Sequence, residues 1–150
     1  MAELTVRIQT EPFDFAMEMT KFGEKIGSSG AMVTFNGVVR DEGASIDYIL
    51  IEHYPVMTES VLKKFSEKAI ARFNLEDVLI IHRYGALKPG EIIMMVATAA
   101  MHRHDAFFGA QFLMDFLKSR APFWKKEISR GQENWVQAKI EDEAALQSWN

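Results

Sequence analysis

Residues 78–99, VLIIHRYGALKPGEIIMMVATA, are the stretch that decides the fold of this chain. Two apolar, β-rich runs, Val78–Tyr84 and Glu91–Ala99, are separated by six residues that include Pro89 and Gly90. A Pro-Gly pair suits the middle of a type II turn, because proline presets φ at the second position and glycine tolerates a positive φ at the third. The stretch therefore predicts a β-hairpin.

The segments on both sides of this hairpin predict helices and further strands. Apolar residues at helical spacing predict helices from the cap Asp14 to Gly27, from Pro55 and the cap Thr58 to about Phe73, and from Asp105 to Arg120 before Pro122. Strands are predicted at Leu4–Ile8, Ala31–Val39, Ile46–His53 and near Trp135–Ile140, with a short acidic helix from about Asp142. Because residues 41–45 are rich in turn formers, Ala31–Val39 and Ile46–His53 are expected to form another hairpin.

This order of elements predicts an α+β fold with a mostly antiparallel sheet covered by helices. The 150 residues are expected to form a single domain, 1–150. Apolar residues make up 48% and charged residues 25% of the chain, which excludes disorder as the main state. No apolar run approaches the roughly 20 residues of a membrane span, and the charged start does not suit a signal peptide, so a cytoplasmic location is expected.

Cysteine content and charge limit the chemistry. The chain has no cysteine, which excludes disulfides, iron–sulfur clusters and a cysteine nucleophile. Its net charge of −4 argues against binding nucleic acid, which requires a surplus of basic residues. Between residues 101 and 139, however, seven basic residues stand against four acidic ones. This local cationic patch predicts a small anionic ligand.

One candidate anion site lies where a strand gives way to a helix, at residues 101–105. His102 and Arg103 there are expected beside free N–H groups and the positive end of a helix dipole. Alternatively, His104 or Asp105 caps the helix while Arg103 pairs with a carboxylate. His53 and His82 lie in strand-like segments and are interpreted as packed core residues; no metal site is expected.

A second cationic cluster, Lys118, Arg120, Lys125 and Lys126, lies at the other end of the same helix. The break at Pro122 allows Lys125 to fold back towards Lys118, and close cations lower one another's pKa, which favours a lysine base or nucleophile. Alternatively, the lysines complement the helix dipole while Phe123 and Trp124 fill the core. Arg40, at the tip of the hairpin expected after Val39, is either solvated or directed at a phosphate or carboxylate.

The length of the helix separates the two clusters. Fifteen residues from Arg103 to Lys118 at 1.5 Å each correspond to about 22 Å. Two side chains cannot reach one small ligand from both ends of such a helix. If both clusters serve one site, the protein is a symmetric oligomer in which His102 and Arg103 of one protomer complete the pocket around Lys118 and Lys125 of its neighbour.

Several segments in a fixed order resemble the catalytic large subunit of molybdopterin synthase, from about Phe13 to Trp149. They are Val33–Arg40 (VTFNGVVR), Ile51–Glu59 (IEHYPVMTE), Ile81–Gly85 (IHRYG) with Pro89–Glu91, His102-Arg103, and Gln111–Lys118 with Ala121–Glu127 (APFWKKE). The resemblance implies an α/β hammerhead fold with a small additional β lobe. It also implies a homodimer that binds a ubiquitin-like small subunit at each end to form a heterotetramer.

By the same resemblance, the enzyme is a sulfurtransferase of molybdenum cofactor biosynthesis and needs no cofactor of its own. The small subunit carries the sulfur as a C-terminal Gly-Gly thiocarboxylate. Two sulfur transfers convert cyclic pyranopterin monophosphate (precursor Z) to the dithiolene of molybdopterin. The missing cysteines fit an external sulfur carrier, and the cationic patch fits a phosphate-bearing substrate.

The resemblance also assigns roles to residues. Lys118 would be the principal catalytic lysine, a proton shuttle or a cation that stabilises the transition state. Lys125 would hold the substrate or the tail beside it. Substrate binding would fall to Arg40, to His102 and Arg103 across the dimer, and to Phe35 and Met114, for which core packing is the alternative.

Two positions depart from the family pattern, and two other functions remain as alternatives. Lys139 stands where the family has an arginine, and the turn at residues 41–45 is short. One alternative is a non-catalytic adaptor that binds the tail of a ubiquitin-like protein and does not need Lys118. The other is a nucleic-acid module that uses the patch from Lys118 to Lys126, against which the acidic total argues.

Overall fold

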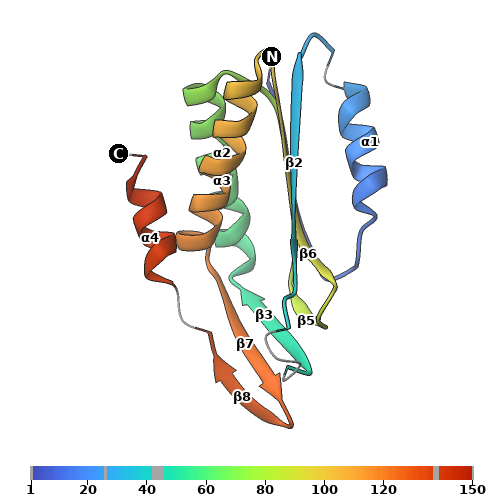
Figure 1. The fold of residues 1–150 in the computed structure, drawn as a ribbon, viewed down its shortest axis with the longest axis vertical. Coiled ribbons are helices and arrows are strands. Elements are labelled where there is room, and N and C mark those ends of the chain that lie inside the picture. The colour runs from blue at the N-terminus through green and yellow to red at the C-terminus, as the bar shows by residue number, and fades with distance from the viewer. Residues whose placement is uncertain (1, 26, 42–45, 137–138, 150) are drawn as a thin grey trace.

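The structure is a computed structural model that describes residues 2–25, 27–41, 46–136 and 139–149. In chain order its elements are β1 (Glu3–Gln9), α1 (Phe15–Lys25), β2 (Ala31–Val38), β3 (Tyr48–His53), α2 (Pro55–Phe73), β4 (Leu75–Arg83), β5 (Gly85–Leu87), β6 (Ile92–Ala100), α3 (Arg103–Ser119), β7 (Phe123–Ser129), β8 (Gln132–Trp135) and α4 (Ile140–Gln147). Figure 1 shows α1 on one side of the long strands, α2 and α3 on the other, and α4 outside α3. None of the described helices is long and apolar enough to cross a membrane.

The predicted central hairpin forms the middle of a four-stranded sheet in the order β1-β4-β6-β2. Strands β4 and β6 pair antiparallel, whereas β1 runs parallel to β4. At the connecting turn the Glu91 N–H donates to the Lys88 carbonyl at 3.1 Å, and Gly90 has φ 91°. The hairpin and its type II turn are therefore confirmed.

The middle of β4, residues 78–81, is apolar because helices cover both of its faces. Val78 and Ile80 belong to the large core beneath α2 and α3, whereas Leu79 and Ile81 pack with Phe22 of α1. Neighbouring residues thus alternate between two apolar layers, as side chains of a strand must. The sheet fixes α3, which carries both cationic clusters at its ends, against a rigid surface.

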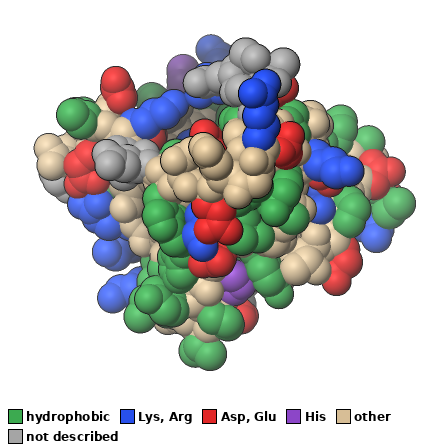
Figure 2. Space-filling model, turned by 90° about the horizontal axis from the view of Figure 1, so that it is seen from below, with side chains coloured by type: hydrophobic (Ala, Val, Ile, Leu, Met, Phe, Trp, Pro, Cys, Tyr) green, Lys and Arg blue, Asp and Glu red, His purple; other side chains and the backbone are tan. Residues whose placement is uncertain are grey.

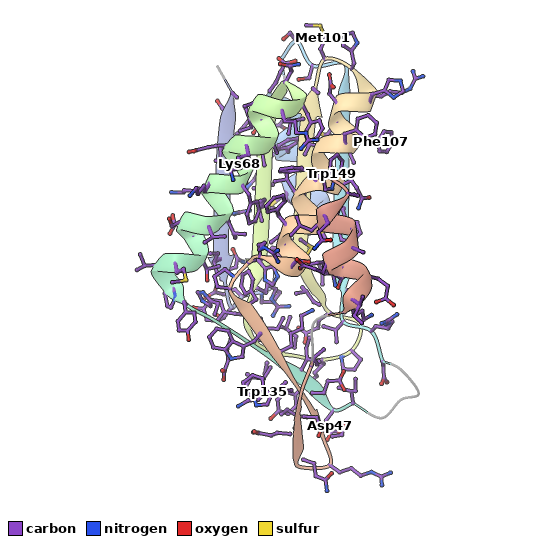
Figure 3. All side chains as sticks on the ribbon, turned by 90° about the vertical axis from the view of Figure 1, so that its left-hand side faces the viewer. Asp47, Lys68, Met101, Phe107, Trp135 and Trp149 are labelled. Atoms are coloured by element: carbon purple, nitrogen blue, oxygen red, sulfur yellow. The ribbon has the colours of Figure 1, made fainter. Side chains whose placement is uncertain are left out.

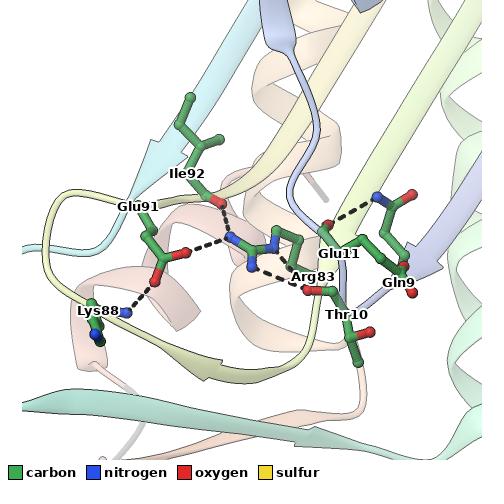
Figure 4. A network of polar contacts seen from close by, with 7 residues as sticks. All are labelled: Gln9, Thr10, Glu11, Arg83, Lys88, Glu91 and Ile92. Carbon is green, nitrogen blue, oxygen red and sulfur yellow. Dashed lines mark hydrogen bonds and ion pairs between the residues drawn. The ribbon is translucent and has the colours of Figure 1, made fainter.

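A buried arginine ties the ends of β1, β4 and β6 together (Figure 4). The Arg83 guanidinium donates to the Thr10 carbonyl at 3.1 and 3.2 Å, to the Ile92 carbonyl at 3.2 Å and to Glu91 Oε1 at 3.3 Å. Glu91 also accepts the Lys88 N–H, and this bond, together with Arg83, lowers the pKa of its carboxyl. The network fixes the turn at the end of the central hairpin.

The hairpin expected between Ala31–Val39 and Ile46–His53 is wrong. Strand β2 pairs with β6 in the first sheet, and β3 pairs with β5 and β7 in a second sheet of order β5-β3-β7-β8. The turn expected at residues 41–45 lies largely outside the described residues. Alternating apolar residues predict that a strand exists but not its partner, and the apolar edge of β6 is the partner that buries β2.

The second sheet is the small β lobe that the resemblance implied, and it contains three strands that the sequence analysis missed, β5, β7 and β8. Strands β7 and β8 form a hairpin around Arg130 and Gly131, whose φ values of 51° and 78° both suit a tight hairpin turn. Residues 137–138 of the strand predicted near Trp135–Ile140 lie outside the described residues, and its placement is wrong for the others, because β8 ends at Trp135 and α4 begins at Ile140. The charged residues of β7 hid its strand character.

Helix α2 begins earlier than the predicted cap. Tyr54 is its N-cap residue, and Thr58 is fully buried within the first turns, where its hydroxyl donates to the Tyr54 carbonyl at 2.6 Å. Pro55 occupies the first helical position, where its missing N–H costs no hydrogen bond. The role predicted for Thr58 as a cap is therefore wrong. With these corrections, the α+β class and the mostly antiparallel sheets are confirmed.

Candidate active site

Lys118 and Lys125 come together at the turn that connects α3 to β7. Lys118 lies in the last turn of α3 and is exposed, and Lys125 lies on β7 opposite Ile51 of β3. The helix ends where Arg120 donates its N–H to the Phe116 carbonyl at 2.7 Å. Lys118 is close enough to lower the pKa of Lys125. The prediction that Lys125 folds back towards Lys118 is therefore confirmed.

Lys125 is the lysine whose surroundings alter its chemistry. Burial is the main cause of its lowered pKa, and the positive charge of Lys118 is the next. Lys139 lowers the pKa of Lys125 further, whereas the carboxylate of Asp142 raises it. A lysine with a lowered pKa releases its proton more readily, so Lys125 can give or take a proton at a site where Lys118 supplies a positive charge.

Helix α4 brings Lys139 and Asp142 to the lysine pair. Lys139 is the N-cap residue of α4, and Asp142 lies in its first turn. The helix is held against α3 by the Arg120 guanidinium, whose two terminal nitrogens donate to the Glu143 carboxylate at 2.6 and 2.8 Å. Lys139 thus lies close to the site in which the family pattern would place an arginine.

Trp149 holds the far end of α4. Its indole N–H donates to Asp115 Oδ2 of α3 at 2.6 Å, and its ring lies 5.5 Å from those of Phe73 and Phe112. Figure 3 shows Trp149 against the middle of α3, between the helices. These contacts at Trp149 and at Glu143 hold the first turn of α4 beside Lys125.

The other two members of the predicted cation cluster point elsewhere. Arg120 is bound to Glu143, and Lys126 Nζ lies 3.6 Å from Glu133 and 4.3 Å from the centre of the Trp135 ring. Neighbouring residues of a strand face opposite sides, so Lys125 and Lys126 cannot both face Lys118. The structure brings together two of the four cations, and the expectation of a four-cation cluster is wrong.

Two histidines lie under the lysine pair. His82 of β4 is buried and stacks on Phe123 with ring centres 3.8 Å apart, and His53 of β3 lies 5.7 Å from the same ring. Burial lowers the pKa of His82 to about 3, with smaller contributions from Lys125, His53 and Lys118. The prediction that His82 is a packed core residue is confirmed, but its closeness to both lysines was missed. No sequence signal links β4 to β7.

His102 and Arg103 lie at the opposite end of α3. Helix α3 is continuous from Arg103 to Ser119, so these residues are about 22 Å from Lys118 along the helix. Figure 3 shows Met101, their neighbour, at one end of the molecule and the β7–β8 lobe with Trp135 at the other. One chain therefore does not bring the two clusters together, as the length of the helix predicted.

The alternative in which His104 or Asp105 caps α3 and Arg103 pairs with a carboxylate is wrong. His102, with extended backbone, is the N-cap residue and makes no capping bond with its side chain, so neither His104 nor Asp105 caps the helix. Within the described residues, Arg103 is in none of the ion pairs. Its guanidinium and the His102 ring are exposed at the positive end of the α3 dipole.

The remaining predicted residues lie around α3 and β2. Arg40 is exposed and follows Val39, whose backbone N–H and carbonyl bond to Glu91 and Gly90, so it lies beside the central hairpin turn rather than at a hairpin tip. Phe35 on β2 is 42% exposed. Met114 is half-buried against the large core, which fits the packing role considered for it. Among the described residues, His, Asp and Glu side chains form no group of three suited to a metal.

The fold and the site define a class: an α+β protein of two sheets in which an exposed and a half-buried lysine together can bind an anion and move a proton. A family model described as MoaE protein matches residues 8–120. The molybdopterin synthase catalytic subunit of Cereibacter sphaeroides is 53% identical over 146 residues, which cover 97% of this chain and 100% of that protein. The chain belongs to the MoaE protein family.

Solved structures agree with this assignment. The molybdopterin biosynthesis MoaE protein from Burkholderia ambifaria MC40-6 has a TM-score of 0.84 and 45% identity, covering 99% of this chain and 98% of that one. A complex of subunits 1 and 2 of the molybdopterin-converting factor from Helicobacter pylori 26695 shares the fold, with a TM-score of 0.75, 18% identity and 91% of each chain covered. The predicted family, fold and enzyme class, a catalytic subunit with sulfurtransferase activity, are confirmed.

Proposed function

We propose that this chain transfers sulfur from the C-terminal thiocarboxylate of a ubiquitin-like small subunit to cyclic pyranopterin monophosphate. The observation that carries the proposal is the Lys118 and Lys125 pair, in which an exposed lysine lies beside a half-buried lysine of lowered pKa. The chain has no cysteine, so the sulfur must arrive on another molecule. A thiocarboxylate and a phosphate are both anions, and both suit a pocket with paired cations.

The two lysines divide the work. Lys118, exposed at the end of α3, can meet an incoming tail and neutralise negative charge that develops during transfer. Lys125 lies deeper and releases its proton more readily, so it can exchange protons with the reacting groups or hold the substrate. Arg40, His102 and Arg103 are the candidates that bind the phosphate and the pterin, with Phe35 and Met114 lining the pocket.

A homodimer completes this pocket in the proposal. Among the described surfaces that expose large apolar side chains are the start of α3, through Phe107 and Phe108 at 59% and 52%, and β2, through Met32 and Val38 at 38% and 52%. Strand β2 is also an edge of its sheet. Exposed apolar surface and an unpaired edge strand both favour association. Pairing of these surfaces would bring Arg103 to the partner protomer.

The alternatives are less well supported. An adaptor that only binds a ubiquitin-like tail has no need of a half-buried lysine, whose charge is costly to place there. A nucleic-acid module needs a continuous basic surface. In Figure 2, which shows the end of the molecule that carries the β7–β8 lobe, blue basic side chains are interspersed with red acidic and green apolar ones.

Substitution of Lys118 by Ala tests the proposal, with Lys126→Ala as a matched control. Lys126 is a nearby cation that faces away from the site. With thiocarboxylated small subunit and cyclic pyranopterin monophosphate, Lys118→Ala should lower the rate of product formation by about 100-fold or more, because it removes a transition-state cation. Lys126→Ala should retain most of the activity. Calorimetry should find that both variants bind the small subunit like the unsubstituted chain.

Three results would contradict the proposal. Product formation by Lys118→Ala at the rate of the unsubstituted chain would remove the lysine from the mechanism. Binding of the small subunit by the unsubstituted chain without any product formation would favour the adaptor. Binding of oligonucleotides that weakens steeply with salt would favour the nucleic-acid module.

A further inference from the structure

A stack of rings joins the two sheets directly beneath the lysine pair. His82 is the last residue but one of strand β4 in the first sheet, and its ring lies 3.8 Å from that of Phe123 at an angle of 16°. Phe123 begins β7 in the second sheet, where it pairs with His53 of β3. The His53 ring lies 5.7 Å from Phe123 and 4.4 Å from Tyr84. The rings of Phe123 and the two histidines therefore form the joint between the sheets.

Hydrogen bonds fix both imidazoles in one orientation. His82 Nδ1 lies 2.8 Å from the Arg83 carbonyl, which can only accept, so Nδ1 carries the proton. His53 Nδ1 lies 3.1 Å from the Thr58 hydroxyl, which gives its own proton to the Tyr54 carbonyl at 2.6 Å, so His53 Nδ1 also donates. Burial lowers the pKa of both rings, to about 3 in His82, and keeps them uncharged at neutral pH.

The ring stack influences the position of Lys125 because both Phe123 and Lys125 lie on strand β7. Phe123 and Lys125 are two residues apart on β7, so their side chains point to the same face. Lys118 instead belongs to α3, which packs on the first sheet. The distance between the lysines therefore depends on how the second sheet is fixed to the first. The stacking of His82 on Phe123 is a direct side-chain contact between the two sheets beside Lys125.

We propose that His82 is a positioning residue that, by stacking on Phe123, holds β7 so that Lys125 stays beside Lys118. This inference rests on the proposed function of the lysine pair. Histidine suits the task better than phenylalanine, because its Nδ1–H also satisfies the Arg83 carbonyl and so fixes the plane of the ring. His82 itself need not touch the substrate.

The test measures the pKa of Lys125 by NMR in the full chain carrying ¹³C-labelled lysine, with the signal assigned from Lys125→Arg. In His82→Ala the pKa of Lys125 should rise by about half a pH unit, because the lysine moves away from Lys118 and gains water. The same variant should lower kcat for sulfur transfer about tenfold and leave KM within about twofold, since orientation rather than binding is lost. His82→Phe, which keeps the stack, should retain the pKa and most of the kcat.

A double-mutant cycle tests whether His82 acts through Phe123. Phe123→Leu should raise the pKa of Lys125 as His82→Ala does, and the double variant should raise it no further. Phe22→Leu is the control for lost packing, because Phe22 is the buried residue by which α1 packs on the other face of the first sheet. It should lower the melting temperature without changing the pKa of Lys125. If His82→Ala does not fold, Phe123→Leu and His82→Phe carry the same comparison.

Three results would overturn the inference: a pKa of Lys125 that stays the same in folded His82→Ala or Phe123→Leu, equal losses in His82→Phe and His82→Ala, or additive effects in the double variant. A raised pKa of Lys125 with unchanged kcat would also overturn the positioning role. The titration of Lys125 does not require sulfur transfer. A failure of the proposed function, seen as full activity in Lys118→Ala, is therefore distinguishable from a failure of this inference.

Discussion

Asp77 has a carboxyl group in a position that disfavours its charged form. It lies on β4 and is 5% exposed. Burial is the main cause that raises its pKa to about 6, and the nearby Glu3 carboxylate raises it further. Lys25 and the Val78 N–H act in the opposite direction but do not compensate. Because the folded chain holds this proton more tightly than the unfolded chain does, folding is most favoured when Asp77 is protonated.

The Asp77→Asn substitution should therefore stabilise the protein at neutral pH. The contribution of Asp77 is fully present below its ordinary value near 3.8 and is lost as the pH rises towards about 6. At pH 7 the variant should gain on the order of 1 kcal/mol in the free energy of unfolding, and at pH 4 the gain should be much smaller. Urea unfolding at both pH values measures this. An equal effect at pH 4 and pH 7 would contradict the explanation.

At the scale of elements, the junction of β6 with α3 determines where His102 lies. The chain before β2 passes so close to this junction that the Gly30 N–H donates to the Ala100 carbonyl at 3.1 Å. A Cβ atom on Gly30 would lie 2.4 Å from the Met101 carbonyl oxygen. Only glycine permits this approach, because the obstacle is backbone and cannot rotate away. The start of α3 is thus held by a backbone contact as well as by its buried face.

Gly30→Ala should destabilise the protein by about 2 kcal/mol, since the β6–α3 junction must shift to make room. Gly23→Ala provides the matched comparison. Gly23 lies inside α1, and the nearest atoms to its Cβ are those of the Met32 side chain at 3.8 Å. This substitution should stabilise by about 0.5–1 kcal/mol, because alanine favours a helix over glycine. Thermal and urea unfolding distinguish the two, and similar values for both variants would count against the crowded junction.

For the whole molecule, the decisive dimension is the length of α3. Its 17 residues separate His102 and Arg103, the predicted anion site, from the lysine pair by more than two side chains can span. The prediction of a pocket shared across a homodimer follows from this length. Each protomer would then lend its Arg103 to one site and its Lys118 to the other. The expected single domain over residues 1–150 also remains a prediction at this scale.

Mixed dimers should reveal such a shared pocket. Lys118→Ala and Arg103→Ala, each inactive alone, should regain activity when mixed and allowed to exchange subunits. Half of the dimers are then mixed, and each mixed dimer has one intact site of two, so about a quarter of the activity should return. Sedimentation equilibrium checks that both variants are dimers. No recovery after demonstrated exchange would show that Lys118 and Arg103 do not meet in one site.

The local sequence pattern was enough to predict many of the helices, strands and turns of this protein. Alternating apolar residues and the Pro89-Gly90 turn predicted the central hairpin, helical spacing predicted α1 and α3, and Pro122 predicted the break that returns Lys125 towards Lys118. These features depend on residues a few positions apart, whose propensities and turn geometry are intrinsic to the chain. The family followed from longer motifs in a fixed order.

Only the tertiary structure decided which strands pair and what surrounds the lysines. Strand β2 pairs with β6 and not with β3, its neighbour in the sequence. The apolar surface that β2 buries in the first sheet outweighed the local turn signal at residues 41–45. His82 and Phe123 are 41 positions apart in the sequence, yet their rings stack at the joint between the sheets. Long-range packing depends on the shape and apolar surface of the whole fold. The sequence therefore determined the elements and the chemistry available, and the packing of two sheets decided where that chemistry meets.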